Sequence, residues 1–313
     1  MASRREFLIG AAALGAGLLT ASSAEGLEKK VSPGKAGPRV KSREQKLAEL
    51  RADLSSRGYN TSYFDDPRFE IYEDVIRIAG RTPRSKKPKK TFEEIEAEEE
   101  ANREKNLWLK QEAISFYGFH EWLLADAEKK TGVSRFYVLG ILGIETNFMH
   151  QVGRHLAFNA LASMYLCPRD KMVTLGRQEI PELITFAESN SPTFTRAGNA
   201  GPDQYSGVFL PSSWAGAIGY AQFMPSSLNR TFVSAEEGKS PNPFHIQDCI
   251  LSVGRYLEKA GWNHKRNDRR PGRDDTNWRA IKRYNNSSSY VRSVIWMAEY
   301  TRKNVPEPIM RVT

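Results

Sequence analysis

Cysteine is scarce in this sequence, whose 313 residues include only Cys167 and Cys249. An oxidising compartment permits a disulfide between them, but two buried thiols fit the sequence equally well. The apolar stretch at residues 7–19 is too short to span a bilayer, and no later segment is long and apolar enough. We therefore expect no stable membrane insertion. No cysteine comes directly after that stretch, so we expect no lipid anchor there either.

The chain also lacks any run in which lysine or arginine alternates with aromatic residues. Its net charge of +9 favours an anionic partner, and anionic lipid and anionic cell wall both suit that charge. We expect no nucleic acid as a partner. Strand signals are few and short, and there is no internal repeat, so the sequence predicts a mainly α fold. No cofactor motif is present, and we expect no cofactor.

The first 24 residues have the layout of an export signal. A positively charged start precedes the apolar stretch 7–19, and the small residues of 22–24 follow it. The segment SRREFL (residues 3–8) resembles a twin-arginine signal, with an ordinary secretory signal as the alternative. We therefore expect a protein that is periplasmic and soluble after signal cleavage, with a flexible linker over residues 25–41.

Hydrophobic periodicity and capping residues predict helices over most of the remaining chain. The first expected helix starts at Ser42 and has Leu47, Leu50 and Leu54 on one face. Further helices are expected over 91–132, between Thr91 and Gly132, from Ser134 onward, and over 159–190. The last two are expected from Asn242 (the N-cap) and Pro243 to Gly261, and over 289–301. The composition of residues 189–212 predicts a long loop. The basic segment 81–90 predicts a solvated loop, with contact to an anionic polymer as the alternative.

One carboxylate, Glu145, stands in the apolar segment GILGIETNFM at residues 140–149. A solvent-poor setting raises the pKa of a carboxyl group, and a glutamate with a pKa of about 6–7 can donate a proton near neutral pH. A structural ion pair, for example with Arg154, is the alternative. Gly140 and Gly143 in the same predicted helix indicate close backbone packing or room for a ligand.

A second constellation lies in SWAGAIGYAQFMPSS, residues 213–227. Its small residues surround Gln222, an amide that both donates and accepts hydrogen bonds, as binding of a sugar hydroxyl or acetamide requires. The glycines would let a ligand approach the backbone closely. Tyr220 and Phe223 would offer flat faces to sugar rings. A helix with a core stripe, stopped by Pro225, is the alternative.

The motifs GIETNF, NALASM, SWAGAIGYAQFMPSS, VGRYLEKAGW and RYNNSSSYVRSV together resemble the lytic murein transglycosylase B family, glycoside hydrolase family 103. The resemblance covers roughly residues 42–300. It implies a lysozyme-like helical catalytic domain with small additional helical and loop regions, followed by a tail over 301–313. It also implies that peptidoglycan glycan strands are cut between N-acetylmuramic acid and N-acetylglucosamine without water, which leaves 1,6-anhydromuramyl ends.

The same resemblance implies roles for individual residues. Glu145 falls on the catalytic glutamate, and Ser213 falls on the serine that orients it. Four residues fall on cleft positions near the cleavage point: Gln222, Tyr256, Tyr284 and Asn285. The family's paired arginines are represented by Arg169 alone, since Asp170 stands at the second position. The stretch 234–240 lacks the oxygen ligands of the family's calcium loop, so we expect no metal.

Ordinary glycosidases use two carboxyl groups, one as acid and one as base or nucleophile. Asp170, Glu179, Asp203 and Asp248 are candidates for a second group, but none stands in surroundings like those of Glu145. A single glutamate suffices where the C6 hydroxyl of the substrate attacks C1. The sequence therefore predicts a lytic transglycosylase, with a water-using muramidase and a non-catalytic peptidoglycan-binding protein as alternatives.

Overall fold

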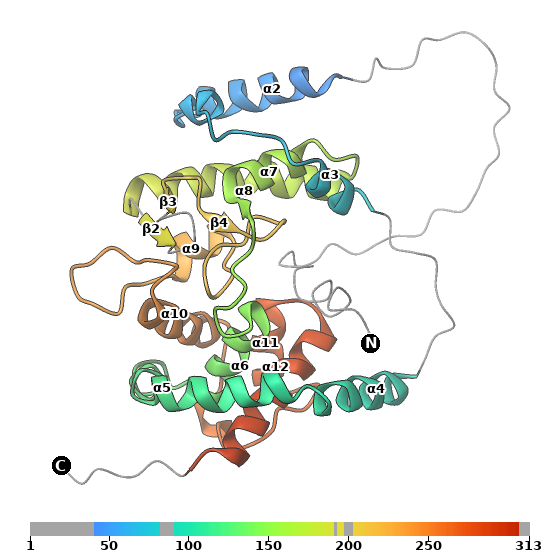
Figure 1. Ribbon diagram of the computed structural model, residues 1–313, viewed down its shortest axis with the longest axis vertical. Coiled ribbons are helices and arrows are strands. Elements are labelled where there is room, and N and C mark those ends of the chain that lie inside the picture. Colours follow the sequence, from blue (N-terminus) through green and yellow to red (C-terminus); the bar gives the residue numbers. More distant parts are fainter. Residues whose placement is uncertain (1–40, 82–90, 191–192, 197–202, 307–313) are drawn as a thin grey trace, which may run out of the picture.

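The computed structural model describes residues 41–81, 91–190, 193–196 and 203–306 (Figure 1). The expected export signal, nearly all of the expected linker and most of the basic segment 81–90 lie outside these ranges. Helices make up most of the described chain, which confirms the mainly α prediction. None of the helices in these ranges is both long and apolar enough to cross a membrane.

The first described helix is α2 (Arg43–Ser56), at the top of Figure 1. Its start was predicted correctly: the Ser42 hydroxyl accepts from the Gln45 amide, and the Gln45 side chain accepts from the Ser42 amide. Leu50 and Leu54 are buried, as the periodicity predicts. The 3-10 turn η1 (Ser62–Asp65) and the short helix α3 (Glu73–Ala79) follow.

The region predicted as one helix over 91–132 is two helices, α4 (Phe92–Glu104) and α5 (Leu107–Thr131). The break occurs because the Asn106 side chain accepts a hydrogen bond from the Leu109 amide at 3.1 Å and caps a new helix. Both predicted ends are confirmed. Thr91 forms a capping box at the start, and Gly132 ends α5 in the left-handed conformation at φ 70°.

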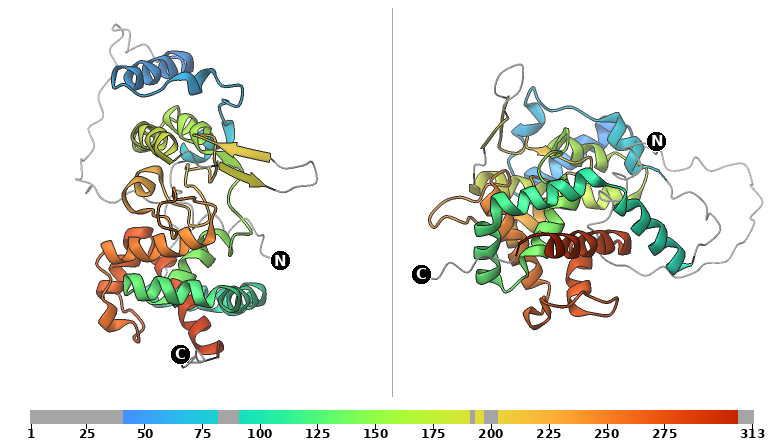
Figure 2. Two further views of the ribbon diagram at one scale, coloured as in Figure 1. Left: turned by 90° about the vertical axis from the view of Figure 1, so that its left-hand side faces the viewer. Right: turned by 60° about the horizontal axis from the view of Figure 1, so that its bottom comes forward.

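The central helix is α6 (Arg135–Thr146), which packs along α12 (Ser288–Asn304) (Figures 1 and 2). A Cβ on Gly140 would lie 2.7 Å from the Val294 carbonyl oxygen, and one on Gly143 would lie 2.5 Å from the Phe148 ring. The two glycines therefore serve close packing within the protein, and the alternative of room for a ligand is wrong. Since α12 ends at Asn304, it enters the segment expected as a tail.

The region predicted as helical over 159–190 is also divided, into α7 (Ala157–Tyr165) and α8 (Asp170–Asn190). Within the predicted loop 189–212, β2 (Thr193–Arg196) and β3 (Asp203–Ser206) pair as an antiparallel hairpin, seen at the side of the molecule in Figure 2. Thr193, Phe194 and Thr195 in β2 and Tyr205 in β3 are residue types that favour this extended pairing. A second small sheet joins β1 (His155–Leu156) to β4 (Pro211–Ser212).

The C-terminal half adds α9 (Pro225–Thr231), α10 (Ile246–Lys259), the 3-10 turn η2 (His264–Arg266) and α11 (Thr276–Tyr284). Pro225 begins a helix and does not end one, so the helical alternative for residues 213–227 is wrong. The predicted start of α10 at Asn242 is also wrong. The Asn242 side chain accepts from the Phe244 amide at 2.9 Å and so caps a turn, and the helix begins four residues later.

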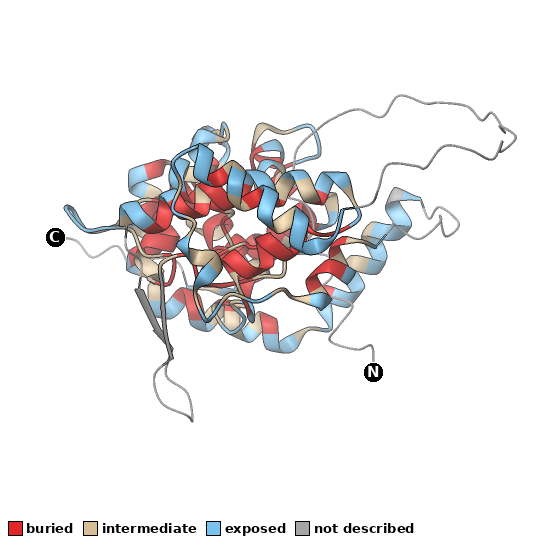
Figure 3. Ribbon diagram, turned by 90° about the horizontal axis from the view of Figure 1, so that it is seen from above, coloured by how far each residue is buried: buried red, intermediate tan, exposed pale blue. Residues whose placement is uncertain are grey.

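Buried residues form one large cluster, in which α5, α6, α10 and α12 meet, and a smaller one where α3 packs on α7 and α8. Figure 3 shows the buried parts of the helices gathered in the interior, with exposed residues outside. Cys249 lies in the large cluster and Cys167 in the small one, and both are free thiols. This confirms the alternative of two buried thiols over a disulfide.

Candidate active site

Glu145 lies in the last turn of α6, directly before a tightly turned segment. Asn147, Phe148 and Met149 all adopt left-handed backbone conformations, at φ 49°, 55° and 73°. Such conformations are costly for side chains other than glycine and persist only where surrounding contacts enforce them. Here the buried Phe148 ring packs on Phe116 at 5.0 Å, and further hydrogen bonds to Thr146 hold the turn.

Thr146 is the residue that fixes this turn. Its hydroxyl accepts from the Met149 amide at 3.1 Å and donates to the Tyr220 carbonyl oxygen at 2.9 Å. Its carbonyl oxygen accepts from the Gln151 amide at 2.9 Å. One buried side chain therefore joins the end of α6 to the loop that contains Tyr220, so the GIETNF and GYAQF motifs meet in space.

The carboxyl group of Glu145 has a strongly raised proton affinity. Burial raises the pKa of Glu145 to about 8, and a hydrogen bond from the Tyr290 hydroxyl opposes that shift. This hydroxyl lies 2.7 Å from Oε1 of Glu145. At neutral pH the group is therefore mainly protonated. The residue is only partly buried, so that it can still meet a bound molecule.

The alternative of an ion pair between Glu145 and Arg154 is wrong. Arg154 is highly exposed and lies 3.5 Å from Asp74. The same Asp74 carboxylate is 3.0 Å from the ring of His155. These groups belong to the packing of α3 on β1, and they leave Glu145 without a guanidinium partner among the described residues.

Three tyrosine rings extend from Glu145 into the protein. The rings of Tyr290 and Tyr284 are parallel within 4° and 6.5 Å apart, and Tyr256 lies 4.8 Å from Tyr284 at a tilted angle. The Tyr284 hydroxyl donates to the Ala221 carbonyl at 2.5 Å, and that of Tyr256 donates to the Arg283 carbonyl at 2.7 Å. The two predicted tyrosines, Tyr256 and Tyr284, therefore lie at the site, where Tyr290 stands between them and Glu145.

Tyr290 is the functional residue that the sequence analysis missed. It is the last tyrosine of RYNNSSSY and lies in the first turn of α12, whose N-cap Ser287 accepts from the Tyr290 amide at 3.3 Å. The available signal was a tyrosine in the first turn of a helix that has an apolar face. It gave no indication of a partner 145 positions earlier.

Ser213 does not hold Glu145 in this structure. Its hydroxyl oxygen accepts from the backbone amides of Ala215 at 3.3 Å and Ala217 at 3.2 Å. It therefore stabilises the turn at the start of its own loop. Within the described ranges, the hydrogen bond that orients the Glu145 carboxyl comes from Tyr290.

Gln222 belongs to the GYAQF motif and is partly exposed. Its backbone is left-handed at φ 51°, and its side-chain amide donates to the Gly219 carbonyl at 2.8 Å and to the Val152 carbonyl at 3.4 Å. Val152 follows the strained turn after Glu145. The amide of Gln222 is therefore fixed next to the segment that carries the glutamate, as a group that recognises a ligand would be.

The glycines of AGAIG have a different role from the predicted one. Gly216 and Gly219 are left-handed at φ 81° and 78°. A Cβ there would lie 2.6 Å from the Leu161 side chain or 2.2 Å from the Pro243 carbonyl oxygen. The backbone comes close to other parts of the protein, so the prediction that a ligand approaches here is wrong.

Phe223 is not a sugar platform, because it is 2% exposed. Its ring packs on Phe232, Tyr256 and Tyr284 at 5.4–5.7 Å and belongs to the core beneath the site. Tyr220 is half-buried, and its ring lies 6.0 Å from that of Phe244.

Asn285 lies next to the helix that carries the partner of Glu145, whereas Arg169 lies in another part of the fold. Asn285 is buried at the end of α11, and its carbonyl oxygen accepts from the Ser287 amide at 2.8 Å, directly before the helix of Tyr290. Arg169 precedes α8 and donates to the carbonyl oxygen of Arg81 at 3.0 Å. It therefore secures the end of α3 and makes no described contact with Glu145.

None of the described candidates for a second carboxylate is paired with Glu145. Glu179 accepts from both the amide and the hydroxyl of Ser226 at 2.8 Å. Asp248 accepts from the amides of Ala235 and Asn242 at 2.8 Å and closes the loop between them. Asp170 is exposed at the start of α8. The side chain of Asp203 lies outside the described part of the structure.

No group of three or more histidine, cysteine, aspartate or glutamate side chains within the described ranges could hold a metal ion. Around Glu145 the described residues supply one protonated carboxyl group, a neighbouring phenol and a fixed amide. This set can donate a proton to a bound molecule and accept one back.

The chain is similar to known proteins in sequence and in fold. The sequence model of a family described as "Transglycosylase SLT domain" matches residues 42–271. The membrane-bound lytic murein transglycosylase B of Escherichia coli is 29% identical over 153 residues. That alignment covers 49% of this chain but only 38% of the E. coli protein, well under two thirds of its length.

Solved structures show the same fold. The soluble lytic transglycosylase SltB1 of Pseudomonas aeruginosa has a TM-score of 0.64 at 20% identity, with 82% of this chain and 98% of that chain covered. The Escherichia coli lytic transglycosylase Slt35, solved with bulgecin A, gives 0.64 at 17% identity, with 82% and 93% covered. SltB3 of P. aeruginosa, solved with NAG-NAM-pentapeptide, gives 0.64 at 17% identity, with 83% and 80% covered. These likenesses confirm the lysozyme-like helical fold.

Proposed function

The chain belongs to the transglycosylase SLT domain family, and from this premise we propose that it is a peptidoglycan lytic transglycosylase. It cleaves the β-1,4 bond between N-acetylmuramic acid and N-acetylglucosamine without water and leaves 1,6-anhydromuramyl ends. The observation that carries this proposal is Glu145, whose pKa of about 8 keeps it protonated and whose described neighbours include no second carboxylate.

The reaction needs one group that first gives and then takes a proton. Glu145 donates its proton to the glycosidic oxygen as the bond to C1 breaks. The resulting carboxylate then accepts the proton of the C6 hydroxyl as O6 bonds to C1. The Tyr290 hydroxyl, 2.7 Å away, stabilises the intermediate carboxylate. Glu145 ends protonated, and no water is consumed.

The other residues of the site bind and orient the glycan in this proposal. The partly exposed amide of Gln222 contacts sugar hydroxyl or acetamide groups. Tyr256, Tyr284 and Asn285 support the wall that positions Tyr290, and Ser213 shapes the loop that carries Gln222. NAG-NAM-pentapeptide, with which SltB3 of P. aeruginosa was solved, is a substrate fragment of this class.

The same proposal places the protein in the periplasm. Residues 1–24 act as a twin-arginine export signal, residues 25–41 as a flexible linker and residues 42–304, up to the end of α12, as the catalytic domain, with the C-terminal tail after it. The positive net charge suits a cell wall whose peptide stems carry carboxylates.

The test is Glu145→Gln, assayed by mass spectrometry of fragments released from purified sacculi. We expect cleavage to fall by at least about 10²-fold, because general acid–base catalysis contributes about 10²–10⁴-fold. Glu258→Gln, an exposed change on α10, serves as the matched control and should keep full activity. Unchanged turnover in Glu145→Gln would refute the proposal.

The products of the unaltered protein separate the remaining alternatives. Anhydromuramyl ends, about one water lighter than reducing ends, support transglycosylation. Reducing ends would instead identify a muramidase that uses water. Binding to sacculi with no released fragments would identify a non-catalytic wall-binding protein.

A further inference from the structure

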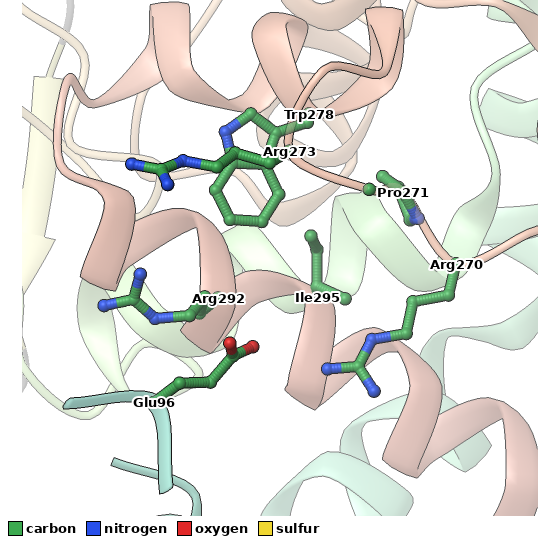
Figure 4. A pocket seen from close by; sticks show the side chains of 8 residues that line it. Glu96, Arg270, Pro271, Arg273, Trp278, Arg292 and Ile295 are labelled. Carbon is green, nitrogen blue, oxygen red and sulfur yellow. The ribbon is translucent and has the colours of Figure 1, made fainter. Parts of the chain in front are cut away.

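A cavity of about 260 Å³ opens on the far side of α12 from Glu145. Tyr290, which contacts Glu145, and Arg292, which lines the cavity, are two positions apart and thus leave the helix about 200° apart. The remaining walls come from Glu96 of α4, the loop 270–273, Trp278 of α11 and Ile295 of α12. This arginine pocket, lined by Arg270, Arg273 and Arg292, is distinct from the proposed catalytic site (Figure 4).

Positive charge is concentrated at the base of the arginine pocket. Arg292 and Arg103 are both 5% exposed, and both bond to the single carboxylate of Glu99 at 2.7–2.9 Å. Burial lowers the pKa of Arg103, and the charge of Arg292 lowers it further. The partly buried carboxylate of Glu99 therefore bonds to two buried guanidinium groups, and the charge of Glu100 also acts on Arg103.

Further arginines stand at the mouth. Arg270 and Arg273 are exposed and come from one short loop, and Glu96 is the only acidic side chain among the lining residues that the structure describes. The described lining residues thus include three arginines and one glutamate. Guanidinium groups suit a bound carboxylate because they can bond to both of its oxygens.

The rest of the lining is apolar. Pro271, Trp278 and Ile295 are all buried, and Figure 4 shows Ile295 between Arg292 and Arg270, with Trp278 above them in this view. The volume lies below the roughly 300–1,000 Å³ of pockets that hold drug-sized ligands. The pocket therefore fits a small group that has both an anionic end and an apolar side chain.

We propose that the arginine pocket is an accessory site for the carboxyl end of a glycan-borne peptide whose last residue has a small apolar side chain. The proposal rests on the proposed function, because peptidoglycan supplies such peptides. The carboxylate meets the arginines, and the apolar side chain lies against Trp278 and Ile295. Since the pocket and Glu145 lie on opposite sides of α12, it holds wall material beside the strand that is cut.

The test measures binding of acetyl-D-alanyl-D-alanine to the full chain by calorimetry and by the NMR signal of the Trp278 indole. The same peptide with a C-terminal amide, and inorganic phosphate, are titrated in parallel. We expect the acid to bind at least fivefold more tightly than the amide or phosphate, and we expect it to shift the indole signal.

The variant Arg270→Ala/Arg273→Ala should weaken binding of the acid at least fivefold. Both side chains are exposed, so the fold should survive, which thermal unfolding checks. Arg269→Ala is the matched control, since it lies in the same loop with the same charge but does not line the cavity. It should leave binding within twofold.

Equal binding of acid and amide, tighter binding of phosphate, or unchanged binding by the double variant would each overturn the proposal. None of these titrations requires a bond to be cut. A protein that is inactive on sacculi can therefore still bind the peptide, and an active protein can fail to bind it. The two proposals are thus tested separately.

Discussion

At Glu145, two opposing influences act on one proton. Burial raises the pKa of its carboxyl group to about 8, while the Tyr290 hydroxyl favours the charged form. Burial is the larger effect, so the resting group is an acid, and the tyrosine supplies its stabilisation when the carboxylate forms. The balance between these two contacts sets the pH range in which the proposed reaction runs.

Tyr290→Phe changes this balance in a predictable direction. Without the hydroxyl, the pKa of Glu145 rises further, so the alkaline limb of the kcat/KM profile should move to higher pH. The rate at the optimum should fall about tenfold or more, since a hydrogen bond to a charged group contributes about 1.5–3 kcal/mol. Tyr300→Phe, on the same helix, should change neither quantity. A lower pH for the limb would contradict this account of Tyr290.

Glu145 also makes the stability of the protein depend on pH. A raised pKa means that the folded state keeps a proton which the unfolded chain, with a pKa near 4.5, releases. The free energy of unfolding therefore falls as pH rises from about 4.5 to 8. Glu145→Gln removes that loss, and since the residue is partly exposed we expect a gain of about 2–4 kcal/mol at pH 8.

Urea unfolding at about pH 3.5 and at pH 8 measures this effect. The variant and the unaltered protein should differ little at about pH 3.5, which is about one unit below the unfolded pKa, because both the folded and the unfolded forms of Glu145 are then largely protonated. A gain of equal size at both pH values would show that the cause is packing and not proton release.

The sequence predicted the raised pKa of Glu145 but not the residue that hydrogen-bonds to it. A lone carboxylate in an apolar helix indicates a raised pKa by itself, and this was confirmed. The orienting partner was assigned to Ser213 by resemblance, whereas the structure places Tyr290 there. That contact joins residues 145 positions apart, and no local pattern specifies it.

At the level of helices and strands, short sequence signals predicted the features that depend on neighbouring residues, such as helix ends. The capping box at Ser42 and the left-handed Gly132 were predicted correctly, because each depends on neighbouring residues. The break at Asn106 and the late start of α10 were missed. In both places an asparagine side chain bonds to a nearby amide, and the periodic pattern continues across the break.

The contact of α6 with α12 gives a test at this scale. Gly140→Ala puts a Cβ 2.7 Å from the Val294 carbonyl, a backbone atom that cannot move alone. We expect a loss of about 1–3 kcal/mol in the free energy of unfolding from this overpacking, despite the better helix propensity of alanine.

Gly118→Ala on α5 is its matched control, since nothing lies within 4 Å of the added Cβ. It should stabilise the protein by up to about 1 kcal/mol. Urea unfolding compares the two. If both changes stabilise the protein, the packing of α6 on α12 is looser than the structure indicates.

For the whole molecule, composition and motif order predicted the class and the family, because many weak signals add up along the chain. They did not predict how the chain encloses its site. The segments that meet at Glu145 come from residues 145–152, 219–222 and 284–290. Only the packing of α6, α12 and the intervening loops brings them together.

The charge of +9 gives a prediction at this scale. Binding of Glu145→Gln to sacculi, measured by co-sedimentation, should weaken severalfold between about 10 mM and 150 mM salt. The screening length falls from about 30 Å to about 8 Å over that range. Binding that does not depend on salt would mean that contacts within the cleft, and not overall charge, hold the wall.

The position of Glu145 in the last turn of α6 has one further consequence. The aligned peptide dipoles of a helix place about half a negative charge at its C-terminal end. Breaking a glycosidic bond develops positive charge on the sugar ring. The end of α6 therefore offers a fixed negative potential to that ring, which needs no reorganisation during the reaction. The same field disfavours loss of the proton from Glu145 before the substrate arrives.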